Sequence, residues 1–243
     1  MATPLTRKLV IVGDGMVGKT ALLWSYVHRE FCQDYIPTVF ETTAKSVKIR
    51  STGQSVTIGI WDTGGQEEFD QIRQFAYPGS RIILLCYAID CKTSLDNIVE
   101  TWITEINDNC PGVPIILVGC KGDKRTITNG DSNGLTNNII KMTDIIDVAD
   151  RINAYAHIEC SAMTGSNVVT LFEMAAEIIN QADEKESRLV KQTKDTNFKM
   201  LKGLNMRKSG KEADNLATKN SDLPRKVRKG PSLLCGLRSN AQD

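Results

Sequence analysis

The sequence predicts an α/β protein with one open, mostly parallel β-sheet that carries helices on both faces. Short, fully apolar runs, such as residues 9–12 and 114–119, alternate with segments of helical periodicity. Polar, glycine-containing segments follow several of these runs, at the strand ends where open α/β sheets place ligands. One of them, residues 13–20, fits the pattern G-x-x-x-x-G-K-[ST] of a phosphate-binding loop without substitution.

Six strands are expected. Residues 44–50 and 56–61 alternate polar and apolar side chains around a turn, which predicts a hairpin and one antiparallel edge strand. Because Pro37 interrupts backbone hydrogen bonding, residues 31–41 are expected to form an exposed loop. The remaining strands are expected at residues 9–12, 81–89, 114–119 and 157–160, and helices at 21–27, about 94–107, 143–154 and from about 166 onward, with a loop at 126–138.

The charge is unevenly distributed along the 243 residues. Residues 183–243 contain 15 Lys and Arg against 8 Asp and Glu, a net charge of +7, which leaves −6 for residues 1–182 in a chain of net charge +1. We therefore expect a folded domain over residues 1–182 and a basic extension over 183–243, helical at first and disordered from about Gly203. The basic extension suits either contact with an anionic membrane or a solvated disordered segment, and the sequence leaves both open.

The seven cysteines are odd in number and form no C-x-x-C pair, so neither a disulfide framework nor a zinc site is expected. Several, such as Cys86, lie in apolar runs, where cysteine behaves as a small buried hydrophobe. Residues 1–6 do not resemble a signal peptide, and no run reaches 18 apolar residues. We expect a protein of a reducing compartment that is neither secreted nor membrane-spanning.

Three strand ends carry the residues expected to bind a nucleotide. Glycines let backbone N–H groups surround phosphate oxygens, while Lys19 reaches the β- and γ-phosphates and Thr20 offers a hydroxyl to Mg²⁺. Asp62 precedes paired glycines; alone this D-x-x-G pattern is typical of an ordinary turn, but behind a phosphate loop it indicates a metal-binding carboxylate and a γ-phosphate sensor. Lys121 and Asp123 follow another buried strand.

Over residues 8–180 the sequence resembles the small GTPases of the Ras superfamily, and most of all the Rho branch. Residues 35–41 and 61–67 are similar to the first and second switch, residues 159–162 to the last guanine-contacting loop, and the extra residues 124–138 correspond in position to the Rho insert. The resemblance implies the P-loop NTPase G domain, bound GTP or GDP with Mg²⁺, hydrolysis of GTP to GDP and phosphate, and signalling that includes cytoskeleton regulation.

The resemblance also implies roles for individual residues. Gln66 would orient the attacking water, with Lys19 and Thr38 stabilising the γ-phosphate, and Thr20, Thr38 and Asp62 would serve Mg²⁺. A side chain at Gly15 would crowd Gln66. The residues implied to contact the nucleotide are Gly13, Asp14, Gly15, Met16, Val17, Gly18, Lys19, Thr20, Ala21, Phe31, Tyr35, Thr38, Asp62, Gly65, Lys121, Asp123, Ser161 and Ala162.

The sequence departs from the Rho pattern in four places. Cys120 replaces an Asn or Thr, which weakens a side-chain bond to the phosphate loop because a thiol is a poor donor and acceptor. Gly64 replaces the usual Ala, which raises the cost of ordering the second switch. The insert is rich in Asn and Gly where a charged helix is usual. The sequence ends at Asp243 without the C-a-a-X box of prenylated relatives.

Two functions remain open: a hydrolysing GTP switch, and a GTP-binding signalling module with little or no hydrolysis. An ATPase is disfavoured because the Asp123 carboxylate would face acceptors on adenine. The expected partners are effectors at residues 39–41, exchange factors and GTPase-activating proteins, with no nucleic acid. We expect a cytoplasmic protein with weak contact to the inner face of the plasma membrane through residues 224–231, where firm anchoring needs a second signal such as acylation of Cys235.

Overall fold

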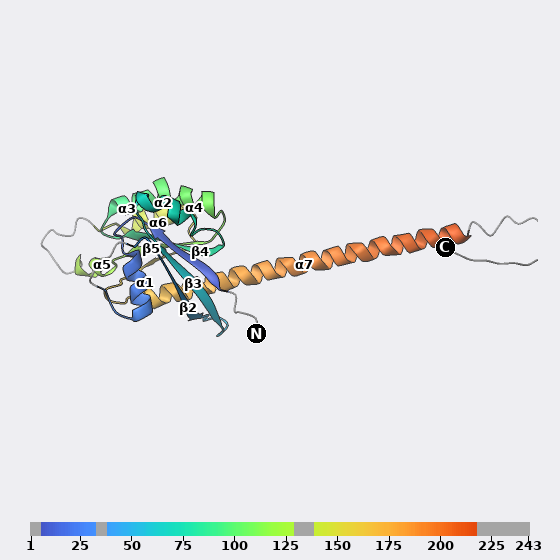
Figure 1. Cartoon of the computed structure of the whole chain (residues 1–243), viewed down its shortest axis with the longest axis horizontal. Helices are drawn as coiled ribbons and strands as arrows, with labels where there is room; N and C mark the ends of the chain where they lie inside the picture. Colours follow the sequence, from blue (N-terminus) through green and yellow to red (C-terminus); the bar gives the residue numbers. More distant parts are fainter. Residues whose placement is uncertain (1–5, 33–37, 129–138, 218–243) are drawn as a thin grey trace, which may run out of the picture. The chain divides into compact units, whose positions relative to one another are not determined.

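A computed structural model describes residues 6–32, 38–128 and 139–217, and these contain a six-stranded sheet. Figure 1 shows its arrangement. The strands lie in the order β2-β3-β1-β4-β5-β6, and all neighbours are parallel except β2 and β3. The predicted fold class, with one antiparallel edge strand, is confirmed. The strand bounds are β1 Arg7–Gly13, β2 Phe40–Lys48, β3 Ser55–Thr63, β4 Ser80–Ala88, β5 Ile115–Cys120 and β6 Ala156–Glu159.

Helices cover both faces of this sheet (Figure 1). Their bounds are α1 Lys19–His28, η1 Glu67–Phe69, α2 Asp70–Gln74, α3 Lys92–Asn97, η2 Ile98–Trp102, α4 Ile103–Asn109, α5 Asp123–Thr128, α6 Met142–Arg151 and α7 Val168–Ala217. The segment expected to be helical at 94–107 is helical throughout 92–109, with a π-helical turn, η2, in its middle. The short helices η1 and α2 were not predicted.

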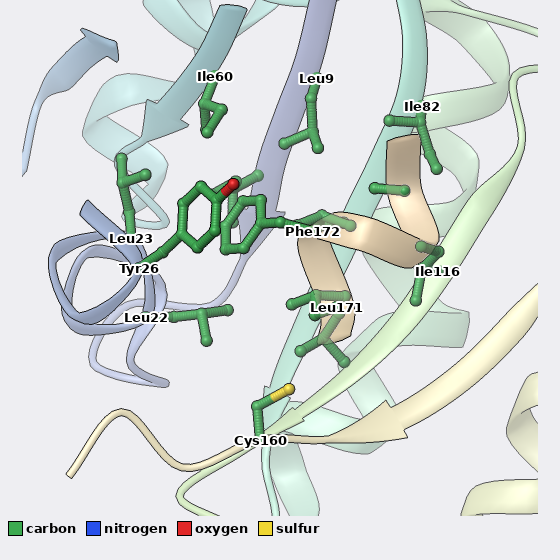
Figure 2. Packing of buried hydrophobic residues seen from close by; sticks show 14 of the residues in the cluster. Leu9, Leu22, Leu23, Tyr26, Ile60, Ile82, Ile116, Cys160, Leu171 and Phe172 are labelled. Carbon is green, nitrogen blue, oxygen red and sulfur yellow. The ribbon is translucent and has the colours of Figure 1, made fainter. Parts of the chain in front are cut away.

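The sheet separates two apolar cores because successive side chains of a strand point to opposite faces. In β1, Leu9 and Ile11 pack with α1 and the first part of α7. Val10 and Val12 pack on the other face, with α3, η2, α4 and α6. Figure 2 shows the first core, where the rings of Tyr26 and Phe172 stack with their centroids 3.8 Å apart.

Three expectations were wrong at element ends. Strand β2 begins at Phe40, inside the predicted loop 31–41, because pairing with β3 extends to Thr63. Residues 126–128 are helical, since Asp123 supplies a carboxylate in the first turn of α5; the rest of the insert, 129–138, lies outside the described residues. Helix α7 runs to Ala217 instead of giving way to disorder at Gly203, because residues 203–217 are rich in helix formers and contain no proline.

The chain divides into two compact units, Met1–Glu186 and Ser187–Asp243. The first unit contains the whole sheet and the strand ends that carry the expected site residues. Among the described residues, no helix combines the length and the hydropathy needed to span a bilayer.

Candidate functional site

The carboxyl ends of the parallel strands border one cavity of about 600 Å³. Its size is within the range of small-molecule sites. Segments far apart in the sequence line it together, as the sequence predicted for a ligand crevice: Gly18 and Thr20, Phe31, Thr38, Asp123, and Ala162.

The glycine-rich turn between β1 and α1 is closed by a lysine. Gly13 and Gly18 have φ angles of 137° and 112°, which side chains rarely tolerate, and a Cβ on Gly13 would lie 2.1 Å from the Cys86 carbonyl oxygen. The Lys19 ammonium donates to the carbonyl oxygens of Gly13 (2.7 Å) and Asp14 (2.8 Å). Burial lowers the pKa of Lys19. A buried cation therefore lies against a loop of backbone amides, an arrangement that suits phosphate.

Other loop residues differ in where their side chains lie. Met16 is exposed and Val17 is packed in the core, so a contact of Val17 with phosphate would come from its backbone. Ala21 lines the cavity from α1. Tyr35 lies outside the described residues.

Three oxygen-bearing side chains from separate segments meet beside this loop. Thr20 Oγ1 donates to Asp62 Oδ2 at 2.6 Å and lies 2.5 Å from Thr38 Oγ1. Asp62 is fully buried, and burial raises its pKa to about 6. Its other oxygen, Oδ1, has no hydrogen-bond partner among the described residues. A buried, unpartnered carboxylate oxygen beside two hydroxyls fits a hard cation such as Mg²⁺.

Within the described part of the chain, no cluster of three or more His, Cys, Asp or Glu side chains could hold a metal ion.

The turn after β3 packs directly on the glycine-rich loop. A Cβ on Gly65 would lie 2.2 Å from the Gly13 carbonyl oxygen and 2.6 Å from the Gly15 nitrogen, so only glycine allows this approach. The next residue, Gln66, is exposed, and a Cβ on Gly15 would lie 3.5 Å from Gln66 Cγ. A Cβ at position 15 would thus be in van der Waals contact with Gln66, and a longer side chain would reach further toward it.

The loops after β5 and β6 are joined by hydrogen bonds. Ser161 Oγ donates to Asp123 Oδ1 at 2.6 Å, and the Gly122 N–H donates to the Cys160 carbonyl oxygen at 2.9 Å. Lys121 follows β5 with a φ of 62° and lies 3.7 Å from the Asp90 carboxylate. Asp123, which lines the cavity, is thus joined through Ser161 to the loop after β6.

Cys120 is buried at the end of β5, next to the glycine-rich loop. A Cβ on Gly18 would lie 3.5 Å from Cys120 Cβ. The thiol therefore occupies the place where the Rho pattern has a stronger hydrogen-bonding group.

Sequence reasoning missed a set of residues behind the crevice. The Asp14 carboxylate accepts hydrogen bonds from Asn97 and Trp102, and buried Arg73 contacts Trp102. Their spacing on helices resembles ordinary core packing, so no sequence signal could have identified them.

The sequence matches the family model "Ras family" over residues 8–181. It is 45% identical over 175 residues to "GTP-binding protein Rho1" of Kluyveromyces lactis, covering 70% of this chain and 82% of that protein. It is 42% identical over 186 residues to "GTP-binding protein RHO1" of Candida albicans, with 76% and 93% covered. A third relative, "GTP-binding protein rho1" of Schizosaccharomyces pombe, is 42% identical over 177 residues, with 72% and 87% covered.

Proposed function

Because the chain belongs to the Ras family, and within it to the Rho-like small GTPases, we propose that the cavity at its strand ends is the site where it works. The protein is a GTP-binding switch that uses Mg²⁺ and hydrolyses GTP to GDP and phosphate. The alternative of a GTP-binding module without hydrolysis gives way to this function.

The observation that best supports the proposed site is the meeting of Thr20, Thr38 and Asp62 beside a loop closed by Lys19. The backbone amides of residues 13–18 hold the phosphates, and the Lys19 ammonium turns from the loop carbonyls to the β- and γ-phosphate oxygens. Bound Mg²⁺ supplies positive charge to the phosphate oxygens. Thr20, Thr38 and Asp62 hold it, directly or through water.

For hydrolysis, Gln66 orients the attacking water, the role of the corresponding glutamine in Ras and Gα proteins. The backbones of Thr38 and Gly65 contact the γ-phosphate. Loss of the γ-phosphate removes these contacts and releases both switch segments. The close approach of Gly65 to the glycine-rich loop and of Gln66 to Gly15 supports these roles.

For base recognition, the Asp123 carboxylate accepts the guanine N1–H and exocyclic amine, held in place by Ser161. Lys121 lies over the base, Phe31 borders its edge, and the Ala162 N–H donates to the guanine oxygen. Adenine offers no matching donors, so Asp123 would face an acceptor. Tyr35, outside the described residues, is proposed to close over the phosphates.

The hydrolytic role is tested by single-turnover kinetics with and without a GTPase-activating protein. Gln66→Leu and Gly15→Val are expected to keep GTP binding and to lower stimulated turnover by roughly 10³-fold or more. Gln74→Leu, at an exposed position of α2, is the matched control and should turn over like the unaltered protein. Stimulated turnover that stays unchanged in both Gln66→Leu and Gly15→Val excludes the role assigned to Gln66.

Members of the Rho family interact with effectors, exchange factors and GTPase-activating proteins. We propose that effectors bind here through Val39, Phe40 and Glu41, whose side chains are exposed next to the crevice. The proposed domains are a G domain over residues 1–182, with the insert at 124–138, and a basic extension over 183–243.

A cytoplasmic location with conditional contact to an anionic leaflet is also proposed, through residues 224–231 and Cys235, which lie outside the described residues. Four cations there supply roughly 1 kcal/mol each at such a surface. The full chain should co-sediment with phosphatidylserine vesicles and not with phosphatidylcholine vesicles, and neutralising Arg225, Lys226, Arg228 and Lys229 should abolish this. Equal sedimentation of that variant would refute the proposed contact.

A further inference from the structure

Two side chains behind the glycine-rich loop hold the carboxylate of Asp14. Asn97 Nδ2, from α3, donates to Asp14 Oδ2 at 2.7 Å. Trp102 Nε1, from η2, donates to Asp14 Oδ1 at 2.6 Å, and Trp102 is only 3% exposed. Hydrogen bonds to a charged acceptor are stronger than neutral ones, and the indole N–H has only this one proton to donate. These two hydrogen bonds therefore fix the glycine-rich loop through the side chain of its second residue, Asp14.

The same tryptophan also contacts the residue that holds the second switch. The Arg73 guanidinium carbon lies 4.5 Å from the centroid of the Trp102 ring, and Arg73 is buried. Arg73 Nη1 donates to the Gly64 carbonyl oxygen at 2.9 Å. Its Nε and Nη2 groups donate to Glu105, and Nη2 also donates to Asp70. Because the guanidinium is planar and held on several sides, it fixes the position of the Gly64 carbonyl.

Gly65, the residue after Gly64, connects these contacts back to Asp14. Gly65 follows Gly64, and a Cβ on Gly65 would lie 2.5 Å from the Asp14 carbonyl carbon. Asp14, Trp102, Arg73, Gly64 and Gly65 thus form a closed circuit of contacts, here called the Asp14–Gly65 ring. None of the five is among the residues that line the cavity, and the side chains of Trp102 and Arg73 are buried.

We propose that Trp102 and Arg73 are positioning residues that set the separation between the glycine-rich loop and Gly65, and thereby the preference of the site for GTP over GDP. The inference rests on the proposed function, in which the Gly65 N–H contacts the γ-phosphate. GDP lacks that phosphate, so displacement of Gly65 weakens the binding of GTP and leaves the binding of GDP nearly unaffected. A tryptophan needed only for packing would not require an N–H aimed at a carboxylate.

The direct test is Trp102→Phe, which keeps an aromatic face for Arg73 and removes the N–H. In competition binding, the ratio of affinities for a slowly hydrolysed GTP analogue and for GDP should fall by roughly three- to tenfold, the effect of part of one charge-assisted hydrogen bond. In an Asp14→Ala background, the same substitution should change the ratio little further. An equal fall in both backgrounds would assign Trp102 to packing alone and overturn the proposal.

A second readout follows the tryptophan itself. In a variant with Trp24→Phe and Trp61→Phe, Trp102 is the single indole. Its emission should change when GDP is replaced by the GTP analogue, because the Asp14–Gly65 ring tightens around the third phosphate. Emission that is identical in the two states contradicts the proposal.

Asn97→Ala removes the other hydrogen bond to Asp14 and leaves the indole of Trp102 in the core. This variant replaces Trp102→Phe in the test if circular dichroism shows that Trp102→Phe does not fold. The affinity ratio should fall in the same direction, and an unchanged ratio in a folded Asn97→Ala protein overturns the proposal. If the unaltered protein binds no GTP analogue, the proposed function fails. If the unaltered protein binds it and both variants keep its ratio, only the positioning role fails.

Discussion

Adding one methyl group at position 64 should disturb the second switch of this protein. Gly64 is buried, and its N–H donates to the Val39 carbonyl oxygen at 3.1 Å. A Cβ there would lie 2.4 Å from Phe69 Cδ2 and 2.7 Å from the Thr38 carbonyl oxygen. Carbon atoms pack best at roughly 3.5–4.0 Å, so Gly64→Ala requires both the ring and the Thr38 backbone to move.

Two effects of opposite sign decide how far Gly64→Ala changes the free energy of unfolding. Overpacking of this kind costs about 1–3 kcal/mol. Replacing Gly by Ala also restricts the unfolded chain, which stabilises a protein by about 0.4–1 kcal/mol when the site accepts the side chain. Since the clash involves backbone as well as a ring, overpacking should win, and the free energy of unfolding should fall by roughly 0.5–2 kcal/mol.

Urea unfolding of the GDP-bound protein measures this change. The displacement of Thr38 should also weaken the Mg²⁺ dependence of the release of a slowly hydrolysed GTP analogue, because Thr38 lies beside Thr20, which bonds Asp62. Phe69→Ala in the same chain removes the ring, so the double variant should lose less stability than the two single variants together. A Gly64→Ala protein that gains about 0.4–1 kcal/mol, the entropic term alone, would refute the packing of Phe69 on Gly64.

Three further changes test separate parts of the molecule. Cys120→Asn should slow GDP release by the equivalent of about 0.5–1.5 kcal/mol, and release that is unchanged or faster counts against a loosened guanine loop. His157 Nε2 lies 3.0 Å from the Tyr87 hydroxyl, and burial lowers the pKa of His157. The free energy of unfolding should therefore decrease as pH falls below about 6.5, and this decrease should be smaller in His157→Gln. Arg125→Ala removes the pair with Glu159 and should accelerate GDP release, as stopped-flow exchange of a fluorescent GDP would detect.

The sequence was sufficient for the sheet and for several residues that border the cavity, such as Gly18, Thr20 and Asp123. Apolar runs such as residues 82–89 have few alternatives to a buried parallel strand, and the hairpin turn at 51–54 predicts the antiparallel edge. The glycine-rich loop and Lys121 come at the ends of β1 and β5, and Asp62 is the second-last residue of β3. Their meeting in space therefore follows from the topology of a parallel sheet.

Other features depend on contacts that no local pattern encodes. The partners of Asp14 lie more than 80 positions away along the chain, on a helix whose spacing resembles ordinary core packing. The slot that Phe69 fills against Gly64 depends on the backbone of Thr38. Helix α7 continues to Ala217 because its helix formers outweigh two glycines, Gly203 and Gly210, although few apolar residues are available there for packing.

The identity of the bound nucleotide tests most directly whether this crevice serves a guanine-nucleotide switch. The protein is purified in Mg²⁺, denatured with acid, and the released nucleotide is separated by chromatography. The expected result is guanine nucleotide, chiefly GDP, with a larger share of GTP in Gln66→Leu. Chelation of Mg²⁺ before denaturation should lower the amount of bound nucleotide, because Asp62, Thr20 and Thr38 then lose their ion. Adenine nucleotide, or a guanine nucleotide that stays bound equally without Mg²⁺, would contradict the roles given to Asp123 and Asp62.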